Sequence, residues 1–245
     1  MAPTIVFITG ANRGLGKGLT TTYLARPDHI VIAGARNPAD SSATGLADLP
    51  KGAGSRLIVV KIDSTVESDA KEAVSQLAAQ GIDHLDIVIA NAGIATIFPS
   101  VEELQIAHLK SHIEVNVYGI VYLYQATLPL LRKAASPKWV TIGSSAGNIG
   151  TLQPIPNAAY APSKIAAHWI TKRIDAEEPE LTAFVFHPGF VQTEMGNSSA
   201  RKFGLPEAPT PVAESIDGMV KVIDGATKEV TGGNFWNYDG EQLVW

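Results

Sequence analysis

The sequence contains no cysteine, which excludes disulfide bonds, thiolate metal ligands and a cysteine nucleophile. It also lacks excess positive charge: the formal net charge is −5, whereas a dedicated nucleic-acid binder carries a basic stripe. No apolar run approaches the roughly 18 residues that span a bilayer, and no basic segment precedes the apolar run that begins at Thr4. We therefore expect a cytoplasmic protein with no metal site and with no nucleic-acid or membrane partner.

What is present is a regular alternation of short apolar runs and helical patterns. The candidate strands are residues 4–9, 30–35, 56–62, 85–90, 139–142, 182–186 and 234–236. The candidate helices are residues 14–25, 66–80, 106–133 and 158–177, with a short helix expected within 38–54. This order predicts a single doubly wound α/β Rossmann domain over 1–245, with a mostly parallel sheet of about seven strands and helices on both faces. The segments 92–100, 146–157 and 190–211 follow strand ends, where ligands bind, and 190–211 is the expected substrate-side loop.

A glycine-rich turn connects the first strand to the first helix. Glycine permits a tight turn and a close backbone approach to a pyrophosphate, which the N–H groups of the following helix can bind. The alternative is a glycine-rich turn that binds nothing, but the position between strand and helix favours a dinucleotide. The predicted cofactor-binding residues in this turn are Gly10, Asn12, Arg13, Gly14, Leu15 and Gly16.

The end of the second strand indicates which dinucleotide is bound. NAD sites carry an acidic residue roughly 20 residues after the glycines, and Arg36 occupies that position here. Arg13 in the glycine turn can face the same point, and two guanidinium groups suit a 2′-phosphate. We therefore predict NADP(H), the alternative being two solvated surface arginines.

Tyr160 and Lys164 lie four residues apart on a predicted helix and so share one face. A free tyrosine titrates near ~10, and a neighbouring ammonium favours the phenolate and lowers that pKa. Tyr160 could then exchange a proton with a substrate oxygen, unless it simply packs beside a solvated lysine. Ser144 and Ser145 follow the fifth strand, where a hydroxyl could donate a hydrogen bond to a carbonyl oxygen.

These motifs together resemble the short-chain dehydrogenases/reductases over essentially the whole chain. The family order is the glycine turn, then Asn91-Ala92-Gly93, Asn116, the serine pair, Tyr160 with Lys164, and Pro188-Gly189. The resemblance implies Tyr160 as acid–base, Lys164 as its ribose-binding partner and Ser144 as the carbonyl-polarising group, with Ser145 second. It implies that Asn116 marks a helix irregularity that holds a proton-relay water. The further cofactor contacts that it implies are Asp63, Asn91, Ala92, Gly93, Pro188, Gly189, Val191 and Thr193.

The three loops at the expected ligand edge carry mainly apolar side chains, and the first two contain no lysine or arginine. This composition suits a bulky apolar or aromatic ketone better than a phosphorylated one, unless the side chains only pack the loops down. Stretches such as 84–95, 181–204 and 223–245 resemble fungal norsolorinic acid ketoreductase-like and carbonyl-reductase-like members, which implies an aromatic substrate. The candidate substrate residues are Ser145, Ile94, Phe98, Ile155, Phe190 and Met195.

Two further expectations concern turnover and assembly. We predict an oxidoreductase that moves a hydride between nicotinamide and a ketone or alcohol, the alternative being an NADP(H)-sensing regulator that lacks turnover. Helices 106–133 and 158–177 carry apolar residues around much of their circumference, which indicates a second buried side. In the resembling family these helices pair across a two-fold axis, so we expect a homodimer or homotetramer.

Overall fold

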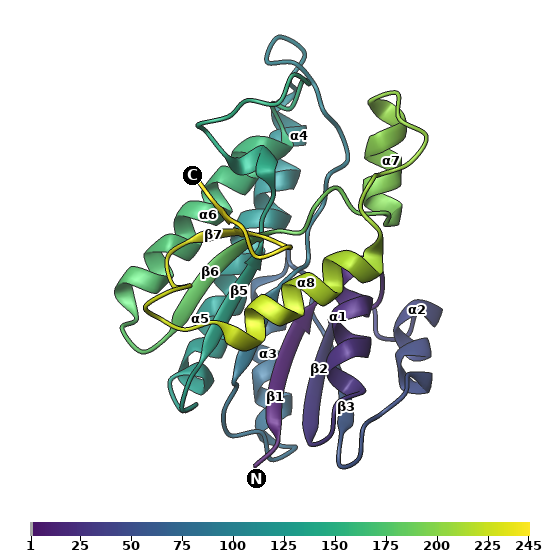
Figure 1. The fold of residues 1–245 in the computed structure, drawn as a ribbon. Helices are drawn as coiled ribbons and strands as arrows, with labels where there is room; N and C mark the ends of the chain where they lie inside the picture. The colour runs from purple at the N-terminus through teal and green to yellow at the C-terminus, as the bar shows by residue number, and fades with distance from the viewer. Residues whose placement is uncertain (1) are drawn as a thin grey trace.

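A computed structural model of the protein describes residues 2–245, which form an eight-stranded sheet of order β3-β2-β1-β4-β5-β6-β7-β8 (Figure 1). The first seven strands are parallel, and β8 joins the edge antiparallel to β7. Their bounds are β1 Thr4–Thr9, β2 His29–Ala35, β3 Arg56–Lys61, β4 Ile87–Ala90, β5 Lys138–Ile142, β6 Thr182–His187, β7 Phe235–Asn237 and β8 Gln242–Leu243. The predicted Rossmann sheet is confirmed, and the two-residue strand β8, too short to show a period, was not predicted.

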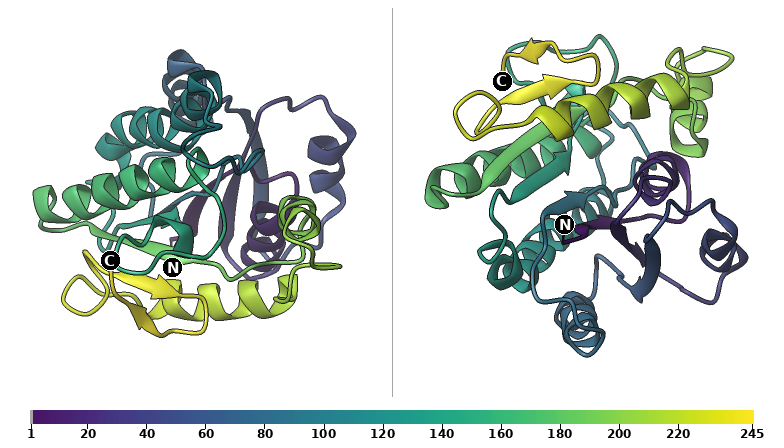
Figure 2. Two further views of the ribbon diagram at one scale, coloured as in Figure 1. Left: turned by 90° about the horizontal axis from the view of Figure 1, so that it is seen from above. Right: turned by 60° about the horizontal axis from the view of Figure 1, so that its bottom comes forward.

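Helices cover both faces of the sheet, as the two views of Figure 2 show. Their bounds are α1 Gly14–Leu24, α2 Ser41–Thr44, α3 Glu67–Ala78, α4 Ile106–Ile113, α5 Gly119–Leu131, α6 Tyr160–Glu177, α7 Glu194–Lys202 and α8 Val212–Gly225. Side chains alternate along β1, so Ile5 and Phe7 pack with α3, α5 and α6, whereas Val6 and Ile8 pack with α1 and α8. The doubly wound layers thus leave the carboxyl ends of the strands free to form a site.

The predicted helix over 106–133 is present as three consecutive helical elements, with a widened turn in the middle. Between α4 and α5 lies the π-helix η2, Glu114–Tyr118, which contains Asn116. A widened turn of this kind often marks a functional site. The short helix expected within 38–54 is confirmed as α2 followed by the 3₁₀ turn η1, Gly45–Asp48.

The helices predicted from the sequence did not include α7 and α8. The segment 190–211, expected as a loop, contains α7, whose sequence EMGNSSARK has few apolar residues that would indicate a helix packed on a core. Helix α8 was missed although its sequence carries a helical pattern: the buried residues Ile216, Met219, Val220 and Ile223 recur at helical spacing. No helix among residues 2–245 is long and apolar enough to cross a membrane.

Candidate active site

The glycine turn brings the end of β1 to the start of α1. Gly10 and Gly14 have φ values of +62° and +52°, which side chains rarely allow. A Cβ on Gly16 would lie 2.1 Å from the carbonyl oxygen of Gly10, so only glycine fits. The first turn of α1 has no side-chain cap, and its N–H groups are available to an anion. Leu15 packs against the core beneath the turn.

The polar residues near the turn have partners that the sequence did not reveal. Asn12 donates a hydrogen bond to Ser42 over 2.8 Å. Arg13 forms a 2.9 Å salt bridge with Glu194, the first residue of α7, although both side chains are largely exposed. Arg36 is exposed directly after β2. Glu194 is thus an acidic partner of Arg13 that the sequence analysis missed.

Asp63 and Asn91 follow the carboxyl ends of strands β3 and β4, which β2 and β1 separate in the sheet. Burial acts to raise the Asp63 pKa, but hydrogen bonds from Thr65 and the charge of Arg36 hold it below its ordinary value. The Asn91 amide donates to the Thr9 carbonyl over 2.8 Å and thereby ties β4 to β1. The backbone N–H of Ala92 donates to the Thr9 hydroxyl over 3.1 Å. These residues therefore line one continuous strand edge.

Asn116 connects the loop after β4 to α6. Its Oδ1 accepts from the Ile94 N–H over 2.8 Å, and its Nδ2 donates to the Ile94 carbonyl over 2.9 Å and to the Ser163 hydroxyl over 3.0 Å. A Cβ on Gly93 would lie 3.1 Å from Asn116 Oδ1 and 3.6 Å from Lys164 Nζ. The helix irregularity expected at Asn116 is present as η2, and Gly93 leaves room above it.

Tyr160 and Lys164 begin α6 and face the end of β5. Lys164 Nζ lies 5.8 Å from the Tyr160 ring and donates to the Ile142 carbonyl over 2.8 Å. Burial lowers the Lys164 pKa to about 8 and raises the Tyr160 pKa to about 12. The Ser144 hydroxyl acts as a hydrogen-bond partner that lowers the Tyr160 pKa, against the larger effect of burial. The protein group that lowers the Tyr160 pKa is thus Ser144, and not Lys164 as the sequence analysis expected.

The two serines after β5 have different surroundings. Ser144 caps the 3₁₀ turn η3, Ser145–Gly147, and its hydroxyl accepts from the Ala146 N–H over 3.1 Å. The Ser145 hydroxyl instead accepts from the Gln153 amide over 2.8 Å. Of the two serines, only Ser144 acts on the Tyr160 pKa. Gln153 is a further polar residue of this edge that sequence reasoning missed.

The segment after β6 lies against the glycine turn. Gly189 has a φ of +87°, and a Cβ there would lie 2.8 Å from the Thr210 hydroxyl, which explains the glycine after Pro188. Val191 is buried and forms a bridge with Thr210. The Thr193 hydroxyl caps α7 by accepting from the Gly196 N–H over 3.1 Å. Its methyl group would lie 3.4 Å from a Cβ on Gly14.

Aromatic side chains from separate segments meet beside Tyr160. Phe98 lies edge-on to Tyr160 at a ring distance of 6.2 Å and contacts Phe203 at 4.9 Å. Phe190 is 6.5 Å from Phe203. Lys202 Nζ donates to the Thr96 carbonyl over 2.6 Å and so joins the end of α7 to the loop that carries Phe98.

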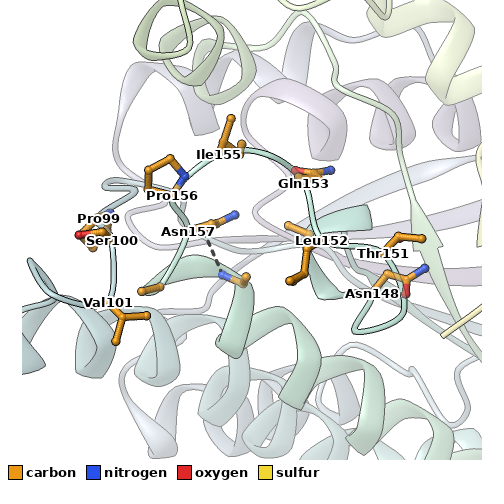
Figure 3. Close-up of a pocket in the computed structure, with 13 residues that line it drawn as sticks. Pro99, Ser100, Val101, Asn148, Thr151, Leu152, Gln153, Ile155, Pro156 and Asn157 are labelled. Carbon is orange, nitrogen blue, oxygen red and sulfur yellow. Dashed lines mark hydrogen bonds between the residues drawn. The ribbon is translucent and has the colours of Figure 1, made fainter.

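A pocket of about 310 Å³ opens between the segment after β4 and the loop before α6 (Figure 3). Ile155 and Gln153 line it, together with Pro99 and Val101 from the opposite side. Ile94 is half-buried and pairs with Asn116, as described above, whereas Met195 is 40% exposed on α7. The structure therefore places Phe98 beside Tyr160, connects Phe190 to Phe98 through Phe203, and places Ile155 in the adjoining pocket.

Comparisons with known proteins agree with this geometry. A family profile described as short chain dehydrogenase matches residues 4–203. Norsolorinic acid ketoreductase of Dothistroma septosporum is 44% identical over 99% of this chain and 92% of its own length. The Aspergillus parasiticus protein of that name is 42% identical over 99% of this chain and 91% of its length. The NADPH-bound carbonyl reductase from chicken fatty liver is 28% identical with a TM-score of 0.88, over 100% of this chain and 95% of that one. The chain belongs to the short-chain dehydrogenase/reductase family of oxidoreductases.

Proposed function

We propose that this protein is a cytoplasmic, NADP(H)-dependent ketoreductase of bulky apolar or aromatic carbonyl compounds. The observation that carries the proposal is the meeting of Tyr160, Ser144 and Lys164 at the end of β5. Tyr160 has Ser144 as a hydrogen-bond partner, lies edge-on to Phe98 and is half-buried. A regulator that only bound the cofactor would have no need for an ionisable hydroxyl with a serine partner at this point.

Each residue has a chemical task in this proposal. Bound NADPH would supply the hydride. The Ser144 hydroxyl donates a hydrogen bond to the substrate carbonyl oxygen, and Tyr160 donates the proton to that oxygen. Burial keeps Tyr160 protonated at neutral pH, because its pKa of about 12 lies far above 7, and reduction requires a protonated donor. Lys164 binds the nicotinamide ribose, and Asn116 holds the water through which Tyr160 regains its proton.

The cofactor preference rests on the two arginines. Arg36 stands where an NAD site places a carboxylate, and Arg13 is the second guanidinium. The chicken fatty liver carbonyl reductase binds NADPH, which supports the same choice. In this proposal the glycine turn holds the pyrophosphate, Asp63 with the segment after β4 holds the adenosine half, and the segment from Pro188 to Thr193 holds the carboxamide.

The substrate class rests on the apolar surroundings of Tyr160. Phe98 lies beside Tyr160 and is connected to Phe190 through Phe203, and Ile155 lines the adjoining pocket. In this proposal Ile94 and Met195 are further apolar contacts, and Ser145 is a polar contact. The names of the fungal relatives specify a ketoreductase, which supports a ketone as the reacting group. We assign the segment 190–211, within one domain over 1–245, to the substrate side.

We also propose that the chain forms a homodimer or homotetramer through α4, α5 and α6. Within the chain, Ile120, Leu123 and Ala167 are buried against the sheet. Trp169 of α6 remains 64% exposed, and Tyr118 beside α5 remains 48% exposed. These two aromatic side chains support a second contact on the outer side of the same helices.

The decisive test of the proposed function is Tyr160→Phe, with Tyr122→Phe as a matched control outside the site. NADPH consumption is measured with a panel of aromatic and aliphatic ketones, and NADPH binding by fluorescence. We expect Tyr160→Phe to lower kcat by roughly 10²- to 10⁴-fold while NADPH still binds, because only the proton donor is lost. Retention of most of kcat, or NADPH binding by the wild-type protein without turnover of any ketone, would overturn the proposal.

A further inference from the structure

One face of α6 holds the end of β5 through three side chains at helical spacing. The Thr171 and Thr141 hydroxyls are 2.6 Å apart. Lys164 donates to the carbonyl of Ile142, as described above. His168, one turn beyond Lys164, accepts from the backbone N–H of Ser144 through Nε2 over 3.2 Å. The side chain that follows Tyr160 and Lys164 on the same face therefore contacts the backbone of the serine itself.

His168 is held rigidly in this position. It is 2% exposed and packs between Phe235, at a ring distance of 4.7 Å, and Trp245, at 5.8 Å. In Figure 1 the C-terminal segment passes beside α6 and β7. A Cβ on Gly143 would lie 2.3 Å from His168 Nε2, and one on Gly147 would lie 2.6 Å from its Cε1. The glycines on both sides of the serine pair thus leave the space that the imidazole fills.

The direction of the hydrogen bond from the Ser144 N–H determines the tautomer of His168. Because the Ser144 N–H can only donate, Nε2 must carry a lone pair, and the proton of the neutral ring lies on Nδ1. A second imidazole repeats the arrangement, since His187 Nδ1 accepts from the Ser145 N–H over 3.2 Å. The next N–H, of Ala146, donates to the Ser144 hydroxyl. Three successive N–H groups of the serine turn are thereby bound.

We propose that His168 is a positioning residue for ketone reduction, which accepts the Ser144 N–H and so holds the Ser144 hydroxyl beside Tyr160. The proposal rests on the function proposed above, in particular on the role of Ser144. His168 acts through the serine backbone and takes no direct part in proton or hydride transfer. An error of about 1 Å in the placement of a reacting group can lower a rate by about a hundredfold, so such an acceptor has a measurable effect.

The electrostatic surroundings keep His168 neutral. Burial lowers its pKa to about 3, and the positive charge of Lys164 on α6 acts in the same direction, as does His187 on β6 when it is protonated. The Gly147 backbone acts to raise the pKa, although His168 Nδ1 is buried with no hydrogen-bond partner among residues 2–245. Beyond the packed rings, Lys172 lies 4.6 Å over Trp245, and the Asp239 charge acts on His187. The acceptor at Nε2 is therefore retained across the neutral pH range.

The test is a double-mutant cycle that combines His168→Phe with Ser144→Ala. Phenylalanine keeps the aromatic packing but removes the acceptor. We expect His168→Phe alone to lower kcat by roughly 10- to 100-fold, with the Kd for NADPH changed by less than about twofold. In the Ser144→Ala background it should lower kcat by no more than about twofold, because the residue acts through the serine. A structural defect would lower kcat in both backgrounds.

Two more variants separate positioning from stability. His187→Phe removes the matched imidazole beneath Ser145 and leaves the Ser144 N–H paired, so its effect on kcat should be at least about fivefold smaller. His168→Gln offers an oxygen near the position of Nε2 and should recover most of kcat. Equal losses in His187→Phe and His168→Phe, or an equal loss in both serine backgrounds, would overturn the proposal. An unchanged kcat in His168→Phe would do so as well.

A measurement on the wild-type protein tests the arrangement without any substitution. Nitrogen-15 NMR of labelled histidine distinguishes the Nδ1–H tautomer from the Nε2–H tautomer and from the cation. The proposal requires His168 to be the Nδ1–H tautomer from pH 6 to 8, and either other form would overturn it. Failure of the proposed function is distinguishable, because the wild-type protein would then turn over no ketone or Ser144→Ala would retain kcat. Failure of this inference alone leaves Ser144→Ala impaired and His168→Phe active.

Discussion

The proposed preference for NADP(H) predicts an unequal loss of affinity when Arg36 and Arg13 are removed. Arg36 is exposed beside the end of β2, close enough to Asp63 to lower the pKa of that carboxyl group. Arg13 is already paired with Glu194 at 2.9 Å. A 2′-phosphate must therefore compete with Glu194 for Arg13, whereas Arg36 forms no salt bridge with any residue from 2 to 245.

The expected magnitudes follow from the strength of hydrogen bonds to charged groups. Such bonds contribute about 1.5–3 kcal/mol each, so Arg36→Ala should raise the Kd for NADPH by roughly 10- to 150-fold. Arg13→Ala should raise it less, by about tenfold or below, because its exposed pair with Glu194 must be exchanged or shared. Glu194→Gln should tighten NADPH binding by about two- to fivefold, since it releases Arg13. The Kd for NADH, which has no 2′-phosphate, should change by less than about twofold in every variant.

The assay is fluorescence titration of NADPH and NADH into each variant at fixed ionic strength. Arg173→Ala is the matched control, because Arg173 forms an exposed salt bridge with Glu177 on α6, away from the glycine turn. The informative quantity is the ratio of the two Kd values, since a general loss of folding would weaken both cofactors alike. An Arg13→Ala/Arg36→Ala double variant with an unchanged ratio would show that both arginines are solvated surface residues and would refute the assignment.

Three more outcomes are expected. Ser144→Ala should lower kcat by roughly 10²-fold and at least tenfold more than Ser145→Ala, and the reverse order in steady-state assays would transfer the role to Ser145. Light scattering at micromolar concentration should give a multiple of 25.9 kDa that Trp169→Glu reduces towards one chain, and a single-chain mass for the wild type would contradict the oligomer. Burial lowers the pKa of His168 to about 3 and of His187 to about 4, below the usual value of about 6.5, so the unfolded chain binds more protons between these values. The contribution of each histidine to the free energy of unfolding is therefore full above pH 6.5 and falls on acidification by about 1.4 kcal/mol per pH unit. Urea unfolding from pH 7 to 4.5 measures this pH dependence. If the pH dependence were unchanged in His187→Phe, the prediction would be wrong.

Local sequence patterns were sufficient where a feature depends on neighbouring residues. The seven parallel strands follow from apolar runs, and β1 begins and ends where its run does, at Thr4 and Thr9. The glycine turn could be located because only glycine tolerates the conformations at Gly10 and Gly14. Tyr160 and Lys164 could be paired because a helix places residues four apart on one face. The same spacing reaches His168, but nothing in the sequence shows that its ring contacts Ser144.

Other features depended on contacts between distant segments. Helix α7 has few apolar residues, and its contacts include the salt bridge of Glu194 with Arg13, 181 residues away. The choice of Ser144 over Ser145 depends on which hydroxyl faces Tyr160 and which one Gln153 occupies.

The sequence alone thus determined the seven parallel strands, the glycine turn and the tyrosine–lysine pair, because backbone geometry sets those relations over a few residues. The tertiary structure alone decided the direction of the Tyr160 pKa, since a pKa depends on burial and on every group nearby. It also decided the partner of Arg13 and the histidine beneath the serine turn. Folding brings these groups together from strands and helices far apart in sequence, and the order of residues does not encode such distances locally.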